Sequence, residues 1–162
     1  MSEAISRRTM LGMLGAAAAA GTAAVAAPAR AQTAPPQFGL QESVQDALKR
    51  LFGSRPIKDG GALVKLEVPP IAENGAVVPV SVEVQSTMTA QNYVKHIYVI
   101  ADHNRIPVTT RVALTPEAGH AFMGANIRLG ETTDVRAIVE QSDGTLLQVK
   151  REVKVTVGGC GG

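Results

Sequence analysis

Aromatic residues and cysteine are scarce in this chain of 162 residues. It has no tryptophan, three phenylalanines, two tyrosines and one cysteine. A single cysteine cannot form an internal disulfide, and without tryptophan the Cys…Trp…Cys signature of antibody domains is excluded. Nucleic-acid binding is also disfavoured, because the sequence has neither a long basic run nor a basic patch interleaved with aromatic residues.

Motifs for catalysis and for metal binding are missing as well. The sequence has no Gly-x-Ser-x-Gly elbow of a serine hydrolase. Its three histidines, His96, His103 and His120, do not pair at the i, i+2 or i, i+4 spacings that place two ligands on one face of an element. A blue-copper site would need the cysteine, histidine and usually methionine held around one ion. We therefore expect no catalytic residue, no metal site and no bound cofactor.

The first 31 residues are predicted to be an export signal. Twin arginines, Arg7 and Arg8, precede an apolar stretch that begins at Met10, and Ala29-Arg30-Ala31 offers a small-x-small cleavage site. This pattern is typical of the Tat route, so we expect cleavage after Ala31 and a periplasmic protein. A transmembrane anchor is the alternative, but a span needs about 20 strongly apolar residues, and alanine and glycine dilute this stretch.

Removal of this signal takes away three arginines and one glutamate, which leaves a formally neutral mature chain. Its length suits one domain with a real hydrophobic core. We expect no membrane segment in this mature form.

Apolar periodicity predicts one helix before a series of strands. Residues 32–39 form a Pro-containing lead-in, and the apolar positions of 40–52 repeat with a helical period of 3.6. Ser43 is a candidate N-cap, and Gly53 with Pro56 beyond it is expected to end the helix. Such a stripe is typical of a helix that packs on its own domain, although it could also contact a partner.

From Gly60 onward the apolar period changes to two, which predicts strands. These are expected at 62–68, 78–84, 93–101, 108–114, 120–129, 132–141 and 145–157. We predict a turn at Glu73-Asn74-Gly75, a bulge near Lys150-Arg151, and a central strand at 93–101 that is covered on both faces. The alternating valines of 78–84 could face either the core or a partner.

About seven strands, frequent turn residues and no recurring helix indicate the fold class. We predict an all-β, immunoglobulin-like antiparallel sandwich with one N-terminal helix, in a single domain that spans residues 40–157.

The last five residues of the sequence are Gly158-Gly159-Cys160-Gly161-Gly162. Four glycines offer no side chain to bury, so 158–162 is predicted to be a mobile arm that follows the last strand. Cys160 has no charged neighbour, and an unperturbed thiol, with a pKa near 8.5, is mostly protonated at neutral pH. We expect Cys160 to carry a covalently bound group between enzymes without performing chemistry itself. An incidental thiol or an intermolecular disulfide is the alternative.

Together these features resemble the SoxY family, the sulfur-carrier subunit of the bacterial Sox thiosulfate-oxidising system. The resemblance rests on Ser6-Arg7-Arg8, on the size and β pattern of the mature domain, and above all on residues 158–162. It implies that Cys160 is the covalent attachment point of the sulfur substrate. The glycines that match the family's swinging arm are Gly158, Gly159, Gly161 and Gly162.

The resemblance also implies partners. It predicts a SoxYZ heterodimer with SoxZ, and transient docking to a Sox cytochrome that conjugates thiosulfate, a hydrolase that releases sulfate and a sulfur dehydrogenase. Haem and metals would belong to those enzymes, so the chain is expected to be a non-catalytic carrier.

Two other functions stay open. One is a ubiquitin-like sulfur carrier that uses a Gly161-Gly162 thiocarboxylate. The export signal argues against it, because adenylating enzymes and ATP are cytoplasmic. The other is an interaction domain with an incidental thiol.

Overall fold

The computed structural model describes residues 39–159 of the chain. The chain divides into two units, residues 1–34 and 35–162. The predicted signal peptide and residues 32–38 of the lead-in lie outside the described residues. Among those described, no helix is long and apolar enough to cross a membrane.

The described chain contains one α-helix, one short 3-10 helix and nine strands. In order they are α1 Val44–Phe52, β1 Ile57–Asp59, β2 Val64–Glu67, β3 Ile71–Asn74, β4 Val78–Val84, β5 Val94–Ala101, β6 Val108–Ala113, η1 Pro116–Ala118, β7 Ala121–Ile127, β8 Thr133–Gln141 and β9 Leu146–Val157.

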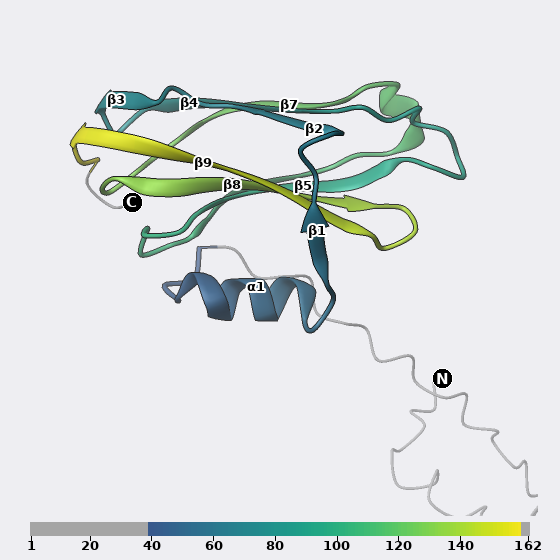
Figure 1. The fold of residues 1–162 in the computed structure, drawn as a ribbon, viewed down its shortest axis with the longest axis horizontal. Coiled ribbons are helices and arrows are strands. Elements are labelled where there is room, and N and C mark those ends of the chain that lie inside the picture. Colours follow the sequence, from purple (N-terminus) through teal and green to yellow (C-terminus); the bar gives the residue numbers. More distant parts are fainter. Residues whose placement is uncertain (1–38, 160–162) are drawn as a thin grey trace, which may run out of the picture. The chain divides into compact units, whose positions relative to one another are not determined.

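The strands form two sheets that pack face to face. The larger sheet has the order β1-β9-β8-β5-β6, with β3 also paired to β9, and the smaller sheet has the order β2-β4-β7. Figure 1 shows these two layers, with α1 on the far side of the larger sheet. The predicted immunoglobulin-like sandwich with one N-terminal helix is confirmed.

The structure adds two short strands that the sequence pattern did not predict, β1 and β3. Both pair in parallel with β9, β1 along residues 146–148 and β3 along residues 154–157. Neither has the apolar alternation of a strand with one buried face, since β1 has no buried residue and β3 buries only Ala72. Their pairing depends on the length of β9, which is 12 residues long and leaves an edge for both.

The main core lies between the two sheets. Val78, Val80, Val82 and Val84 of β4 are all 3% exposed or less. These alternating valines therefore face the core and not a partner. In β5 every residue from Ile97 to Ala101 is buried, as predicted for a central strand that is covered on both faces.

Helix α1 covers the second face of the larger sheet. Ser43 caps it by accepting a hydrogen bond from the Asp46 backbone N–H at 3.1 Å, and Gly53 ends it with a positive φ of 63°. Phe52 packs edge-to-face on Tyr98 of β5, with 5.1 Å between the ring centroids. The helix thus packs on its own domain, as its apolar stripe predicted.

Two local predictions were wrong. Glu73 and Asn74 belong to β3, so the turn begins only at Gly75. The bulge predicted near Lys150-Arg151 is absent, because the pairing of β8 with β9 runs without a register shift from Thr133–Val153 to Glu140–Leu146. Arg151 is on the same face of β9 as the buried Val153, which was the reason for predicting a bulge. It is nevertheless exposed, because it lines a groove beside β2, so the strand needs no bulge.

Candidate functional site

Strand β9 delivers the predicted attachment motif to one end of the sandwich. Gly158 and Gly159 are described, whereas Cys160, Gly161 and Gly162 lie outside the described residues. At this end the Gly75–Ala76 turn that joins β3 to β4 meets the 128–132 connection between β7 and β8. We call these two segments, together with Gly158 and Gly159, the cradle.

Backbone hydrogen bonds link the three segments of the cradle. The Gly75 N–H donates to the Val157 carbonyl at 2.7 Å, and the Leu129 N–H donates to the Gly75 carbonyl at 2.7 Å. The Gly159 N–H then donates to the Leu129 carbonyl at 2.9 Å. The last described residue of the chain is therefore tied to a connection that lies far from it in sequence.

Three glycines of the cradle lie where a side chain would not fit. A Cβ on Gly159 would lie 2.7 Å from the Ala76 backbone N and Cα, a separation that real Cβ atoms essentially never show. A Cβ on Gly158 would overlap the Gly130 carbonyl oxygen, and one on Gly75 would overlap the Leu129 carbonyl oxygen. Gly159 is buried. Gly158 and Gly159, the first two residues of the predicted arm, thus lie close to backbone of other segments.

Exposed valines and exposed charged residues both surround the cradle, since its 128–132 connection carries Arg128 and Glu131. Val77 is 62% exposed and Val157 is 61% exposed, and neither supplies an ionisable group. His103 lies on the β5–β6 turn, where its Nδ1 is 3.0 Å from the Thr132 carbonyl oxygen and 3.7 Å from Glu131 Oε1. One of the three histidines is thus near the cradle, in a position that its sequence spacing did not indicate.

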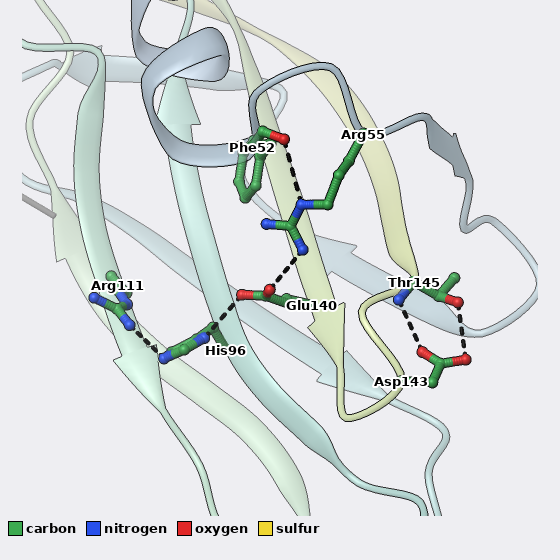
Figure 2. A network of polar contacts seen from close by, with 7 residues as sticks. All are labelled: Phe52, Arg55, His96, Arg111, Glu140, Asp143 and Thr145. Atoms are coloured by element: carbon green, nitrogen blue, oxygen red, sulfur yellow. Dashed lines mark hydrogen bonds and ion pairs between the residues drawn. The ribbon is translucent and has the colours of Figure 1, made fainter. Parts of the chain in front are cut away.

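The other two histidines lie elsewhere. His120 is exposed just before β7, and its Nε2 lies 3.1 Å from Glu83 Oε1. His96 belongs to β5 and is part of a polar network on the helix side of the larger sheet (Figure 2). Within residues 39–159 no group of three or more His, Cys, Asp or Glu side chains could hold a metal ion.

Glu140 of β8 is the centre of that network. Its Oε1 accepts from Arg55 Nη1 at 2.8 Å, and its Oε2 is 3.0 Å from His96 Nδ1. Figure 2 shows Arg111 at the other nitrogen of His96, so the contacts run from Arg111 through His96 to Glu140 and Arg55. Burial alone would raise the pKa of Glu140, but the hydrogen bonds from Arg55 and His96 outweigh it and lower this pKa.

His96 is held neutral by this arrangement. Burial lowers the pKa of His96, and repulsion from Arg111 lowers it further, against the opposing effect of the hydrogen bond to Glu140. Arg111 can only donate, so His96 Nε2 accepts, and Nδ1 carries the proton that it donates to Glu140. His96 lies five residues before Ala101 on β5, which is about 17 Å along the strand. Since the cradle is beyond Ala101, the network is separate from it.

A groove of about 760 Å³ lies between the outer strands β6 and β7. Thr110 and Arg111 line it from β6, and Asn126 lines it from β7. Asn104 also belongs to its lining, and the Asn104 side chain binds the connection that holds Gly159. The groove therefore adjoins the cradle.

Solved structures resemble this fold. The structure of the sulfur carrier protein SoxY from Chlorobium limicola f. thiosulfatophilum matches with a TM-score of 0.59 and 29% identity, over 71% of this chain and 97% of that one. A superoxide reductase (neelaredoxin) variant from Ignicoccus hospitalis matches with a TM-score of 0.52 and 17% identity, over 70% of this chain and 93% of that one. The second likeness shows the fold alone.

The sequence itself matches one family. No curated protein sequence matches the chain. The family profile described as "Sulfur oxidation protein SoxY" matches residues 48–160, which are most of the chain and include Cys160. The chain therefore belongs to the SoxY family of sulfur oxidation proteins.

Proposed function

We propose that the protein is a periplasmic sulfur carrier that holds intermediates of thiosulfate oxidation covalently on Cys160. The observation that carries this proposal is the family match, which extends through residue 160 and so includes the only cysteine of the chain. The solved relative is itself described as a sulfur carrier protein. Strand β9 adds support, because it leads directly from the folded sandwich to the segment that contains Cys160.

The proposed loading step is oxidative. The Cys160 thiolate forms a sulfur–sulfur bond with thiosulfate, and the two electrons pass to the haem of a partner cytochrome. The product is a cysteine S-thiosulfonate. Nothing in the sequence next to Cys160 would activate its thiol, since Lys154 is the nearest cation in the chain. Activation would therefore come from the partner.

The later steps also belong to partners. Water would cleave the terminal sulfonate as sulfate and leave a persulfide on Cys160. A sulfur dehydrogenase would then accept six electrons from that sulfane sulfur, with three waters supplying the oxygen atoms of a sulfonate. A second hydrolysis would release this sulfonate as sulfate and restore the thiol. In this proposal SoxZ forms the heterodimer, Gly158, Gly159, Gly161 and Gly162 form the arm around Cys160, and the chain itself is not catalytic.

Intact mass spectrometry of the protein recovered from the periplasm of cells given thiosulfate tests this function. We expect a chain that begins at Gln32 and carries added sulfur or sulfonate on Cys160, and an unmodified chain in the Cys160→Ser variant. A modification that persists in the variant would contradict the proposal. If that modification is at the C-terminal carboxylate, it would indicate a thiocarboxylate carrier. Unchanged thiosulfate-dependent growth of the variant would indicate an interaction domain.

A further inference from the structure

We propose that an open stretch of the β9 edge, residues 149–153, binds a short extended segment of a partner protein that presents an acidic side chain to Arg151. Two adjoining grooves of about 420 Å³ and 350 Å³ lie at this stretch, and both are lined by Gly61 and Arg151. Arg151 lies six residues before Val157, where β9 ends, which is about 20 Å along the strand. The inference therefore goes beyond the proposed carrier function and does not involve Cys160.

Strand β9 has one fully paired edge and one interrupted edge. On the first edge, β8 pairs with residues 146–153 without a gap. On the other edge, β1 pairs along residues 146–148 and β3 along residues 154–157, toward opposite ends of β9 (Figure 1). Among the described residues no strand pairs with 149–153 on this side. The gap is about 17 Å long, since a strand rises about 3.3 Å per residue.

Backbone groups in this gap point toward the open side. The Gln148 carbonyl accepts at 2.9 Å from the N–H of the residue after β1, and the Lys154 N–H donates at 3.0 Å to the carbonyl of the residue before β3. Alternate residues of a strand direct their N–H and C=O groups to the same side, so those of Lys150 and Glu152 face this edge as well. An extended segment that lies between β1 and β3 can therefore pair with both residues, as in β-strand addition.

Three consecutive residues of β9, Lys150, Arg151 and Glu152, are exposed at the gap. Side chains of a strand alternate between its two faces, so Arg151 shares its face with Val149 and Val153. Val153 is buried in the core between the sheets, and Val149 packs against that core. Arg151 therefore points toward the smaller sheet, at a place where the interruption of the edge leaves its side chain uncovered.

The charges of the two grooves favour an acidic occupant. The other charged side chains that line them each contact another described residue: Lys150 contacts Asp134, Lys65 contacts Glu67, Glu83 contacts His120, and Asp59 contacts the Gly61 N–H. Arg151 has no hydrogen bond or ion pair with any residue of 39–159. Its guanidinium can bind a carboxylate through two parallel N–H donors, so an acidic side chain opposite Arg151 supplies the missing partner.

The length of the gap selects a short segment. The β9 strand of a second copy has 12 residues, about 40 Å, and would overlap β1 and β3 on either side of the gap. About five extended residues fit between them. The first groove also contains Gln148 Oε1, which is buried and accepts no hydrogen bond from the described residues. An N–H of the bound segment would satisfy this acceptor.

Amide NMR of the protein with a synthetic peptide tests the site. The probe is a blocked Thr-Val-Glu-Val-Thr peptide, whose central glutamate lies opposite Arg151 when the two valines pair with Lys150 and Glu152. At millimolar peptide we expect the largest shift changes at the amides of Lys150 and Glu152, because these face the open edge. The Arg151 amide faces β8 and should change less. A Thr-Val-Lys-Val-Thr peptide should leave all three amides unchanged.

A pair of variants then tests the role of the arginine. Arg151→Gln should weaken binding of the glutamate peptide about tenfold, because the charge-assisted pair is lost. Lys154→Gln removes one positive charge from the same strand beyond the gap, so it is the matched control and should bind like the unmodified protein. Both residues are exposed, and neither change alters the core.

Three results would overturn the inference. Unshifted amides of Lys150 and Glu152 at millimolar glutamate peptide would show that the edge does not bind an added segment. Equal binding of both peptides, or equal affinities of Arg151→Gln and Lys154→Gln, would contradict the acidic partner of Arg151. Shifts of these amides that depend on protein concentration without peptide would identify a second copy of the chain as the occupant.

Discussion

Replacement of His96 by glutamine should remove a pH dependence of stability that this histidine causes. His96 Nδ1 donates to Glu140, and Nε2 accepts from Arg111. A glutamine can make the same two kinds of hydrogen bond, through its NH₂ and its carbonyl oxygen, but it does not titrate. The difference between the two proteins therefore isolates the proton on His96.

The direction follows from the lowered pKa of His96, whose ordinary value is 6.5. The unfolded chain takes up a proton at this histidine as the pH falls through 6.5, whereas the folded chain resists it. Stability is therefore fully present above pH 6.5 and is lost as the pH falls toward the folded-state pKa. One proton gives a slope of at most about 1.4 kcal/mol per pH unit.

The charged groups around His96 set this behaviour. Arg111 on β6 and Lys95 on β5 repel an imidazolium, and Glu140 on β8 attracts it. The Glu140 carboxylate is shared with Arg55, so it does not serve His96 alone. Because the pKa of Glu140 is lowered, protonation of Glu140 reduces the stability of the folded protein only below pH 4.5. This lies outside the pH range in which His96 changes the stability.

Urea unfolding of both proteins at half-unit intervals from pH 5 to pH 8 measures the effect. The two stability curves should run parallel above pH 7, and below pH 6.5 the unmodified protein should lose stability relative to His96→Gln. A relative gain in stability of the unmodified protein as the pH falls would refute the reasoning, because it would mean that Glu140 outweighs burial and Arg111. Coincident curves over the whole range would refute it as well.

Two further predictions concern the cradle and the core. Asn104→Ala should lower the free energy of unfolding by about 1–3 kcal/mol, because the Arg128 carbonyl and the Gly130 N–H lose their partner. Urea unfolding measures this loss, with the exposed Asn126→Ala as control, and equal stability of the two variants would contradict the role of Asn104. Val82→Ala, at a fully buried position, should cost about 2–3 kcal/mol at an unchanged m-value, whereas Val77→Ala should stay within about 0.5 kcal/mol. Similar costs at both valines would contradict the assignment of Val82 to the core.

Local chemistry made the helix and the long strands predictable. Ser43 begins α1 because its side-chain oxygen accepts from a backbone N–H of the first turn. Gly53 ends the helix because it adopts the positive φ of the C-cap. The valines of β4 alternate because successive strand residues point to opposite faces, so the sequence contains the pattern of burial directly. The choice of Cys160 as the attachment residue came equally from the sequence.

The sequence by itself thus determined the order of the main elements and the sandwich, since both follow from patterns of neighbouring residues. Only the tertiary structure decided that β1 and β3 pair with β9, and that His96 lies between Glu140 and Arg111. It also placed Gly158 and Gly159 against backbone from distant parts of the chain. Glycine permits both freedom and close approach, and only the fold brings the backbone of Ala76 and Gly130 beside these two residues.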